Sequence, residues 1–392
     1  MKILLIHNFY QQFGGEDAVA LADQQLLQRH GDEVLFYTRH NDEIRAYKFS
    51  NKLAFFPQTI YSLHTKKEIT TVVTKFSPDV AFVHNVFPLI SPSVYHVLRR
   101  LSVPTVQVAH DFRPFCPNGW FYTQGRICER CRSGNYLHGL RDRCYKNSYA
   151  LTALYSLSCG LNRLARVTDK VNAFICLTEF YKRKLLEAGI PERKLFIRPT
   201  FIDVSSIQPA TDVNTGHHAL YLGRLSPEKG IWTVVRAFEH LPKVPLVIAG
   251  TGPLEREISA YVTAKGLGNI RLVGFKSGEE KWQLLKSALF VIVPSECYEN
   301  FPVVVLEAYT AGKPVVASDL GGLPFIVDNG RSGLLFQRGN IEDLVGKIRY
   351  LAGAPPEVER MGNYARQLVV AKYGPEQSYR NLMAIFQWAM RQ

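Results

Sequence analysis

Two glutamates, Glu299 and Glu307, stand eight positions apart around an otherwise apolar run. An ionised carboxylate only accepts hydrogen bonds, so it can hold two neighbouring hydroxyl groups, such as the vicinal diol of a sugar or a ribose. If Glu299 lies in a turn and Glu307 in the helix that follows, both can face one cleft. The backbone amides of Phe301 and Val303 would then lie near the helix N-terminus, which favours anions. The alternative is that both glutamates are ordinary surface acids.

Two cations, Arg224 and Lys229, follow another apolar run and stand five positions apart. An arginine fork and a lysine point charge at this spacing can clamp a diphosphate. The segment does not match the Walker pattern G-x-x-x-x-G-K-[ST], so it is not the phosphate loop of an NTPase. A solvated turn with both cations on the surface is the alternative.

Glycine pairs follow two further apolar runs, at Gly14 and Gly15 and at Gly250 and Gly252. A glycine lets the backbone approach a ligand closely, which would be an anion at the first pair and a base or ribose at the second. The spacing at the first pair is not G-x-G-x-x-G, so the dinucleotide fingerprint is absent there. Tight turns without a ligand explain both pairs equally well.

A histidine, His110, ends the apolar run Thr105–His110. At neutral pH a histidine there can donate a hydrogen bond to a sugar hydroxyl or to a leaving phosphate. The alternative is a half-buried imidazole that is satisfied by a backbone carbonyl.

Four of the seven cysteines form the pattern C-x11-C-x2-C-x12-C, namely Cys116, Cys128, Cys131 and Cys144. This spacing suits a tetrahedral, structural zinc site in a cytosolic protein. Unlinked thiols, disulfides or a cluster are the alternatives.

The elements that must position these residues are visible as short apolar runs between helical patterns, which is typical of buried parallel strands. Ligands of such sheets bind beyond the carboxyl ends of the strands, where the polar residues named above stand. The segment Pro375–Trp388 has helical spacing and predicts a packing helix. The expected strands form two series: Ile3–His7, Glu33–Thr38, Asp79–His84, Thr105–His110, Ala173–Thr178 and Leu195–Arg198, then Ala219–Gly223, Pro245–Ala249, Arg271–Gly274, Phe290–Pro294, Pro314–Ser318 and Gly333–Phe336.

Two successive doubly wound α/β units follow from this count, and 392 residues are too many for one ordinary core. We expect a first domain over residues 1–205, with a Cys-rich insertion at about 113–146, and a second domain over residues 206–374. The segment 199–215 has neither periodicity and is the expected connector.

The composition, with 46% hydrophobic and 21% charged residues, predicts a soluble globular protein. No apolar run reaches membrane-spanning length and no signal-peptide pattern is present, so we expect a cytosolic location. The net charge of +13 is uneven, because residues 1–200 carry 27 Lys and Arg against 16 Asp and Glu, whereas residues 201–392 carry 20 against 18. A basic first half can serve nucleic acid, anionic lipid or a polyanionic substrate, or can be a basic soluble surface without a partner.

Taken together and in order, four of these segments resemble the retaining glycosyltransferases of family 4, the glycosyl transferases group 1. They are Gly14-Gly15, His110-Asp111, Gly223-Arg224 to Lys229-Gly230, and the E-x7-E of Glu299 and Glu307. The resemblance covers nearly the whole chain and is strongest over residues 219–336. It implies the α/β GT-B fold, in which two Rossmann-like, doubly wound domains face each other across a cleft, with residues 375–392 crossing back to the first domain.

The resemblance also implies roles for individual residues in a nucleotide-diphosphate-sugar site. Arg224 and Lys229 would neutralise the diphosphate, Glu307 would hold the ribose, and Glu299 would face the transferred sugar. His110 would meet that sugar from the first domain, and Gly15 would approach the phosphates or the acceptor. The expected catalytic residues are His110, Glu299, Arg224 and Lys229, and the expected donor-binding residues are Gly14, Gly15, Arg224, Lys229, Gly250, Gly252, Glu299, Asn300, Phe301, Val303 and Glu307.

Such enzymes retain the anomeric configuration and stabilise the leaving diphosphate with protein cations, so no catalytic metal or other cofactor is expected beyond the donor itself. The acceptor would be a glycan, a lipid-linked sugar or another hydroxyl compound in bacterial surface polysaccharide or glycoconjugate assembly. The basic first half adds the hypothesis of a peripheral protein at the cytoplasmic membrane face, docked through Arg163, Arg166, Lys170 and Lys182–Lys184. The Cys-rich insertion is not required by the core fold and is expected to order a loop of the acceptor-side domain.

Two other classes compete with this interpretation. A nucleotide-sugar epimerase of the same fold would use the nucleotide side of the site but would need no acceptor. A zinc-containing nucleic-acid-binding protein would explain the charge and the cysteines, but it would leave Arg224, Lys229, Glu299 and Glu307 without a role. We therefore expect no nucleic acid partner. A phosphorylase is not favoured, because no segment suggests a pyridoxal-phosphate lysine.

Overall fold

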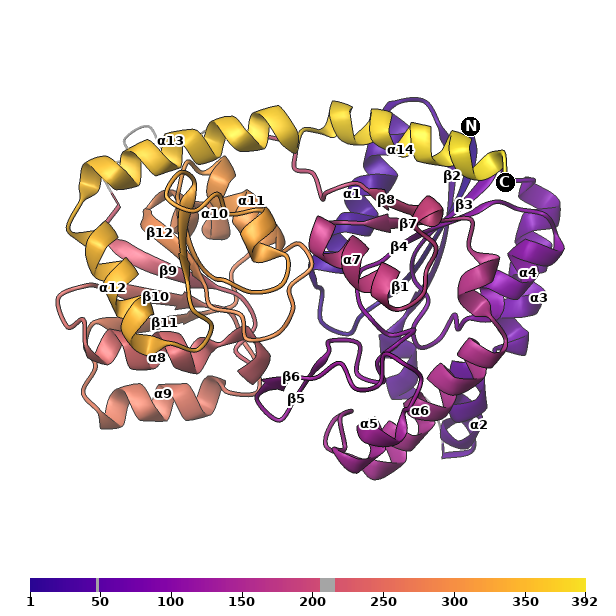
Figure 1. Cartoon of the computed structure of the whole chain (residues 1–392), viewed down its shortest axis with the longest axis horizontal. Coiled ribbons are helices and arrows are strands. Elements are labelled where there is room, and N and C mark those ends of the chain that lie inside the picture. Colours follow the sequence, from indigo (N-terminus) through magenta and orange to yellow (C-terminus); the bar gives the residue numbers. More distant parts are fainter. Residues whose placement is uncertain (47–48, 205–215) are drawn as a thin grey trace. The chain divides into compact units, whose positions relative to one another are not determined.

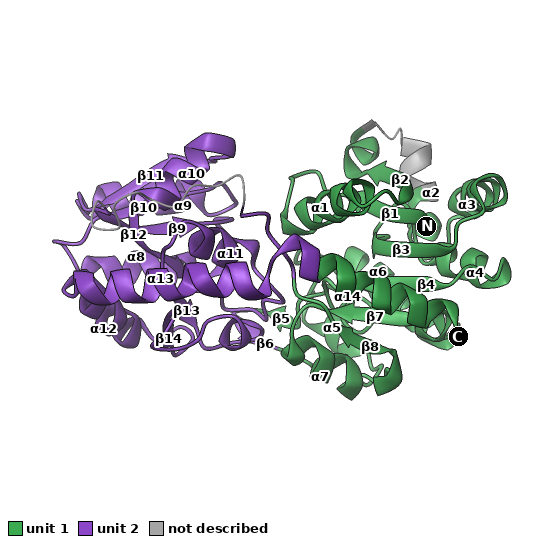
Figure 2. Ribbon diagram, turned by 90° about the horizontal axis from the view of Figure 1, so that it is seen from above, with its two compact units in different colours: residues 1–124, 128–199, 378–392 green, residues 125–127, 200–377 purple. Residues whose placement is uncertain are grey.

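The computed structural model describes residues 1–46, 49–204 and 216–392. The chain forms two compact units, of which the first holds residues 1–124, 128–199 and 378–392 and the second residues 125–127 and 200–377 (Figure 2). The predicted boundary at residues 205 and 206 and most of the expected connector fall outside the described residues.

A six-stranded parallel sheet forms the centre of the first unit, in the spatial order β2-β1-β3-β4-β7-β8 (Figure 1). Its middle strands are continuous apolar runs, and Ile3–Ile6 of β1 are fully buried because helices cover both faces of such a sheet. The chain moves from β1 to one side and returns to the other side for β3, so the strand order reverses between β1 and β3. The strands are β1 (Lys2–Phe9), β2 (Glu33–His40), β3 (Val80–Asn85), β4 (Thr105–Val108), β7 (Ala173–Cys176) and β8 (Leu195–Ile197).

The second unit repeats the plan with the order β11-β10-β9-β12-β13-β14. All five strand pairs are parallel, and the order reverses between β9 and β12. The strands are β9 (His218–Leu222), β10 (Leu246–Ala249), β11 (Ile270–Gly274), β12 (Ala288–Val293), β13 (Val315–Ser318) and β14 (Gly333–Phe336). All twelve predicted strands are therefore confirmed, and so is the α/β architecture of two doubly wound units.

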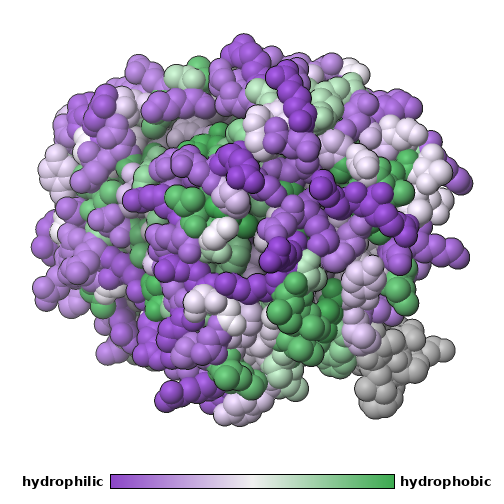
Figure 3. All heavy atoms as spheres, turned by 45° about the vertical axis from the view of Figure 1, so that its right-hand side comes forward, coloured by the Kyte–Doolittle hydropathy of each residue, from purple (hydrophilic) through white to green (hydrophobic). Residues whose placement is uncertain are grey.

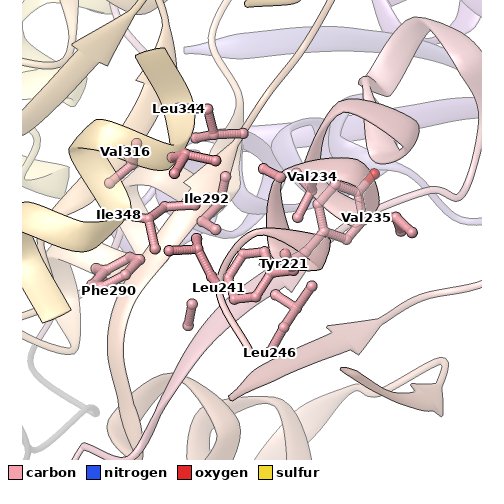
Figure 4. Close-up of a cluster of buried hydrophobic side chains, with 14 of the residues drawn as sticks. Tyr221, Val234, Val235, Leu241, Leu246, Phe290, Ile292, Val316, Leu344 and Ile348 are labelled. Atoms are coloured by element: carbon pink, nitrogen blue, oxygen red, sulfur yellow. The ribbon is translucent and has the colours of Figure 1, made fainter. Parts of the chain in front are cut away.

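The core of the second unit lies between this sheet and its helices, and Figure 4 shows side chains of both converging there. Phe290 and Ile292 of β12 meet Leu344 and Ile348 of the helix Ile341–Ala352 in this cluster. Alternation between strand and helix thus buries both faces of the sheet and one face of each helix, which fixes the loops at the strand ends.

The helices follow the strands in chain order, and several start at a side-chain cap, as Ser148 does for α6 and Thr178 for α7. In the first unit they are α1 (Gly15–Arg29), α2 (Phe49–Ile60), α3 (Leu63–Phe76), α4 (Ser93–Arg100), α5 (Leu137–Arg141), α6 (Tyr149–Leu164) and α7 (Glu179–Glu187), with the 3-10 turns η1 (Asn41–Ala46), η2 (Val167–Lys170) and η3 (Glu192–Lys194). In the second they are η5 (Pro227–Lys229), α8 (Ile231–Glu239), α9 (Glu255–Ala264), α10 (Gly278–Lys286), α11 (Val303–Thr310), η6 (Leu323–Phe325), α12 (Ile341–Ala352) and α13 (Pro355–Lys372).

The predicted packing helix is α14 (Pro375–Met390), and its residues from 378 onward belong to the first unit. Phe386 is fully buried and meets Phe82 of β3 edge to face, with 5.2 Å between the ring centroids. Tyr379 stacks on His30 and donates a hydrogen bond to Asp32 over 3.0 Å. The last helix is therefore part of the first unit's core, although it lies at the far end of the chain.

The Cys-rich insertion lies between β4 and α6 and holds little regular structure. It contains the short strands β5 (Tyr122–Thr123) and β6 (Arg126–Ile127), which pair, and α5. Among the described residues, no helix has the length and apolarity needed to cross a membrane.

Candidate active site

The charged residues predicted for the second unit gather where its strand order reverses. Arg224 stands two residues after β9, Lys229 ends η5, and Glu299 lies in the loop between β12 and α11. Because β9 and β12 are hydrogen-bonded neighbours, their carboxyl ends bring these loops to one edge of the sheet. The crevice beyond such a reversal is the usual ligand position of an open α/β sheet.

Lys229 and Glu299 form an ion pair at this edge, with 2.5 Å between Nζ and Oε1. Ser295 donates a hydrogen bond to the same carboxylate oxygen over 2.6 Å. Burial alone would lower the pKa of Lys229, but the charge of Glu299 and the hydrogen bond to it outweigh burial and raise that pKa. Lys229 is therefore charged at neutral pH, and the ion pair holds the two side chains in place.

Arg224 contrasts with Lys229, since it is exposed and its guanidinium has no ion-pair partner among the described residues. The loop that carries it is nevertheless fixed, because the hydroxyl of Tyr221 donates to the Arg224 carbonyl over 2.7 Å. The site thus offers one uncompensated arginine beside a lysine–glutamate pair, an arrangement that attracts an anion.

Glu307 lies in α11 and pairs with a different cation, Lys281 of α10, with 2.6 Å between Oε1 and Nζ. The structure therefore places the two glutamates of E-x7-E in two separate ion pairs. Asn300 and Phe301 are buried, and Phe301 packs edge to face on Tyr373. Val303 is the first residue of α11, whose first amides have no acceptor within the helix.

The structure explains why glycine stands at positions 250 and 252, which the sequence alone did not reveal. A Cβ atom at Gly250 would lie 1.9 Å from the Gly223 carbonyl oxygen, and one at Gly252 would lie 2.4 Å from the Leu225 carbonyl oxygen. Gly250 also has a φ of 144°, which favours glycine. These glycines let the loop after β10 press against the loop that carries Arg224, so backbone rather than a ligand occupies that side of them.

In the first unit, Gly14 is the N-cap of α1 and Gly15 is its first residue. The Gly14 amide donates to Asp17 over 2.9 Å, and the same carboxylate contacts Nε2 of His7 at 2.8 Å. The Gly14 amide is thus already occupied by a buried carboxylate, which leaves Gly15 as the glycine of this pair that can approach a ligand.

His110 follows β4 and is half-buried. Its Nε2 lies 3.1 Å from Nδ1 of His84, the histidine of β3. Burial, reinforced by the neighbouring His7, lowers the pKa of His110 to about 3, so the imidazole is neutral at physiological pH. The hydrogen bond to His84 replaces the backbone carbonyl that the alternative reading of His110 expected.

Four polar side chains beside these residues were not predicted as a group, namely Tyr10, Glu16, Asp111 and Arg113. The Tyr10 hydroxyl donates to Glu16 over 2.9 Å, and Arg113 pairs with Asp111, with 2.5 Å between Nε and Oδ2. Burial and the charge of Asp111 raise the pKa of Glu16 to about 8. Tyr10 directly follows β1, Glu16 lies in the first turn of α1, and Asp111 and Arg113 lie in the loop after β4. Their position just beyond the strand ends was the one signal that could have found them.

The four cysteines of the insertion are free thiols. Burial, together with the charges of Cys116, Cys144 and Cys128, raises the pKa of Cys131 to about 12, so the four thiols lie in one neighbourhood. Within the described ranges, however, no three His, Cys, Asp or Glu side chains are arranged to hold a metal ion. The predicted zinc geometry is therefore not formed in this structure.

Comparison with known proteins identifies the class. Residues 24–206 match the family described as Glycosyltransferase Family 4, and residues 207–368 match Glycosyl transferases group 1. The chain therefore belongs to the family 4, group 1 glycosyltransferases.

Among relatives, an uncharacterized glycosyltransferase of Methanocaldococcus jannaschii, MJ1178, is 30% identical over 89% of this chain and 87% of its own length. The sulfoquinovosyl transferase SQD2 of Arabidopsis thaliana is 25% identical over 87% of this chain. The match covers only 64% of the plant protein's length. The amylovoran biosynthesis glycosyltransferase AmsK of Erwinia amylovora is 25% identical over 74% of each chain.

Solved structures share the fold. HepE of Anabaena, in complex with UDP and glucose, superposes with a TM-score of 0.69 over 99% of both chains at 17% identity. The sucrose-phosphate synthase of Thermosynechococcus elongatus gives a TM-score of 0.70 at 19% identity, over 98% of this chain and 99% of that one. At these identities the likeness establishes the α/β GT-B fold of the two Rossmann-like units.

Proposed function

We propose that this protein transfers a sugar from a nucleotide-diphosphate sugar to a hydroxyl group of a glycan or lipid-linked acceptor, with retention of the anomeric configuration. The observation that carries the proposal is the exposed Arg224 beside the Lys229–Glu299 pair at the reversal of the second sheet. The complex of HepE with UDP and glucose supports a donor of this kind.

Each charged group has one task in this account. Arg224 and Lys229 bind the diphosphate, and their charges stabilise the leaving group as the glycosidic bond breaks. Lys229 is held by Glu299, so an incoming phosphate would share the lysine with that carboxylate. The cations supply the positive charge at the leaving group, so the proposal requires no catalytic metal.

The two glutamates then divide the rest of the donor. Glu307 binds the ribose hydroxyls, and Glu299 faces the transferred sugar, beside the first-turn amides of α11 that begin at Val303. We assign no covalent role to Glu299, because retention in this account follows from attack on the face that the diphosphate leaves. The role of His110 toward the transferred sugar is the one that the family resemblance implies.

A thermal-shift panel of nucleoside diphosphates and nucleotide sugars tests the donor class, since a ligand that binds only the native state raises the melting temperature. We expect stabilisation by at least one nucleoside diphosphate. No shift with any member of the panel would contradict the proposal.

Assays with and without acceptor separate the transferase from the epimerase alternative. A transferase releases nucleoside diphosphate and forms a new glycoside only when the acceptor is present. An epimerase would convert the donor sugar without any acceptor and would release no nucleotide. The relative named for amylovoran biosynthesis supports polysaccharide or glycoconjugate assembly as the setting.

The acceptor side is proposed to work at the cytoplasmic face of a membrane. On α6 the exposed side chains of Leu157, Leu161 and Leu164 are 55%, 42% and 81% accessible, and their spacing puts them on one helix face. Arg163 and Lys170 lie nearby and donate hydrogen bonds to the backbone carbonyls of Arg132 and Ala165. A backbone carbonyl carries no net charge, so these bonds do not neutralise the two cations. Hydrophobic side chains gather low on the face shown in Figure 3, among hydrophilic ones.

Leucines flanked by cations fit an anionic lipid surface, because acyl chains receive the leucines and headgroups pair with the cations. A second copy of the chain fits less well, since a two-fold contact would bring the cations against themselves. The predicted contribution of α7 is weaker, as Lys182 pairs with Glu192, and Lys184 pairs with Glu129 and Glu187.

Vesicle sedimentation tests this docking surface. At low salt we expect stronger binding to phosphatidylglycerol vesicles than to phosphatidylcholine vesicles. The triple variant L157S/L161S/L164S should lose most of its binding to phosphatidylglycerol vesicles. V370S is the matched control, because Val370 is 54% exposed on α13 of the second unit. Equal binding to both vesicle types, or equal loss in the control, would contradict the proposal.

A structural zinc ion in the insertion remains part of the proposal, supported by the spacing of the four cysteines and by their shared neighbourhood. It requires their thiols to move into a tetrahedral arrangement. Metal analysis of the purified, reduced protein should find about one zinc per chain. C128S should lose it, while C297S, a buried cysteine of the second unit, should keep it. A well-folded, zinc-free sample would refute this site.

A further inference from the structure

A chain of buried polar side chains runs behind His110 in the first unit. His84 lies 3.1 Å from His110, between its Nδ1 and the Nε2 of His110. On its other side, Nε2 of His84 lies 3.4 Å from Oδ2 of Asp23, a residue of α1. The side chains of Asp23 and His84 are fully buried, whereas His110 is partly accessible at the carboxyl end of the sheet.

Asp23 forms a buried ion pair with Arg198. Both terminal nitrogens of the arginine donate to the two oxygens of Asp23, one of them over 3.1 Å, in the bidentate geometry of a strong ion pair. The Nε of Arg198 donates to the Ser378 carbonyl of α14, which fixes the arginine as well. Both oxygens of Asp23 thus accept hydrogen bonds from Arg198, and the position of Asp23 does not depend on His84.

This carboxylate decides where the proton of His84 lies. The contact at 3.4 Å is too long for a hydrogen bond of good geometry, and Nε2 of His84 has no hydrogen-bond partner among the described residues. A proton on Nε2 faces the negative charge of Asp23, whereas a lone pair there would be repelled by it. Neutral His84 therefore carries its proton on Nε2 and presents a lone pair at Nδ1.

The proton of His110 follows from that of His84. The hydrogen bond between the two imidazoles needs one donor, and since Nδ1 of His84 is an acceptor, Nε2 of His110 must be the donor. A neutral imidazole carries one proton, so Nδ1 of His110 has a lone pair. His7 lies near the two histidines, 6.2 Å from His84 between ring centroids, but its own Nε2 contacts Asp17.

We propose that His84 and Asp23 are positioning residues that fix His110 as the Nε2–H tautomer, so that His110 accepts a hydrogen bond from a hydroxyl of the transferred sugar. This reverses the expectation that His110 donates to a hydroxyl or to a leaving phosphate. An ionised phosphate oxygen offers no proton to such an acceptor, so His110 favours a hydroxyl group over a phosphate. The substrate side of the inference rests on the proposed function, whereas the tautomer does not.

The tautomer can be measured without substrate. In protein labelled with 15N at its 11 histidines, long-range 1H–15N correlation spectra distinguish the two neutral tautomers and the imidazolium, and H110N assigns the His110 signals by their loss. We expect His110 to be the Nε2–H tautomer between pH 6 and 8. A proton on Nδ1, or an imidazolium in this range, would overturn the proposal.

Variants of His84 test the relay itself. In H84F the acceptor is lost, so His110 should become a mixture of tautomers, and kcat should fall about tenfold with little change in donor KM. H84N keeps an acceptor oxygen near the position of Nδ1. It should therefore restore most of the Nε2–H tautomer of His110 and most of kcat. A pure Nε2–H tautomer of His110 in H84F would show that His84 does not set it.

The matched control is H218F, since His218 is also a buried histidine with a lowered pKa but stands on β9 of the second unit. It should leave the His110 spectrum unchanged. Should H84F fail to fold, the spectrum of the unaltered protein still decides the proposal. If the tautomer is found but no nucleotide sugar binds, the proposed function fails while the relay stands.

Discussion

At the scale of single residues, the ion pairs of Glu299 and Glu307 give the two glutamates different neighbours. Glu299 pairs with Lys229 and accepts a hydrogen bond from Ser295 at the edge where the diphosphate is proposed to bind, whereas Glu307 pairs with Lys281 on the neighbouring helix α10. A carboxylate beside the proposed reacting sugar and one beside the proposed ribose should affect different steps.

Substituting the glutamates one at a time should separate these steps. E307Q should raise the dissociation constant of the donor about tenfold or more, because it removes a charged hydrogen-bond acceptor, and should change kcat little. E299Q should mainly lower kcat by about tenfold or more. Titration calorimetry and initial rates measure the two effects, and equal, negligible effects would return both glutamates to the class of surface acids.

Glu16 leads to a prediction about pH. Its pKa of about 8 in the folded protein is above the usual value of 4.5, so between these values the folded state holds a proton that the unfolded state has lost. Stability from this group is therefore present below pH 4.5 and declines as the pH rises towards 8.

E16Q removes this dependence. The variant should be more stable than the parent at pH 8, by about 1 kcal/mol after allowance for its partial exposure, and should differ little at pH 5. Denaturant unfolding at pH 5 and pH 8 measures the difference in stability between E16Q and the parent protein. A variant that loses equal stability at both values would show that the carboxyl group acts through its hydrogen bond to Tyr10 alone.

At the scale of elements, the close loops around the candidate site depend on glycine. G250A should lower stability by about 2 kcal/mol or more and weaken nucleotide binding, because the new methyl group meets the Gly223 carbonyl at 1.9 Å. G346A in α12 is the matched control, since a Cβ there meets nothing within 4 Å. Alanine in that helix should be neutral or stabilising by about 0.5–1 kcal/mol, and equal effects of both variants in thermal unfolding would contradict this account.

The strands and the loops at their ends could be predicted from the sequence. All twelve strands followed from apolar runs, because a buried parallel strand must be apolar throughout. The loops at their ends held Arg224, Lys229 and Glu299, since ligands of such sheets bind there.

The partners of these residues could not be predicted. Ser295 follows β12 in a position that sequence could have marked, but Lys281 sits on a helix face with no distinguishing pattern and reaches Glu307 across 26 positions. His84 contacts His110 only because β3 and β4 are adjacent in the sheet. The sequences of the two strands do not show which strands will pair. The predicted zinc geometry is likewise a matter of side-chain placement, which spacing alone does not fix.

At the scale of the whole molecule, each unit carries its own sheet, and the last helix belongs to the first unit although residues 200–377 intervene. F386A should destabilise the first unit by about 3–5 kcal/mol, because it empties a fully buried site against Phe82. Q387A, at the next and exposed position of α14, should change stability by less than about 0.5 kcal/mol. Hydrogen exchange of the β3 amides measures the effect, and equal protection in both variants would contradict the packing role of α14.

The central claim is that the second unit binds the diphosphate of a nucleotide sugar beyond β9 and β12. Calorimetric titration of the unaltered protein, R224A and R256A with the nucleoside diphosphate that best stabilises the protein tests it most directly. Arg256 is an exposed arginine of α9 and serves as the control. We expect R224A to weaken binding about tenfold to a hundredfold, since an arginine hydrogen bond to a phosphate is charge-assisted, and R256A to bind as the parent does. Equal affinity in all three proteins would contradict the claim.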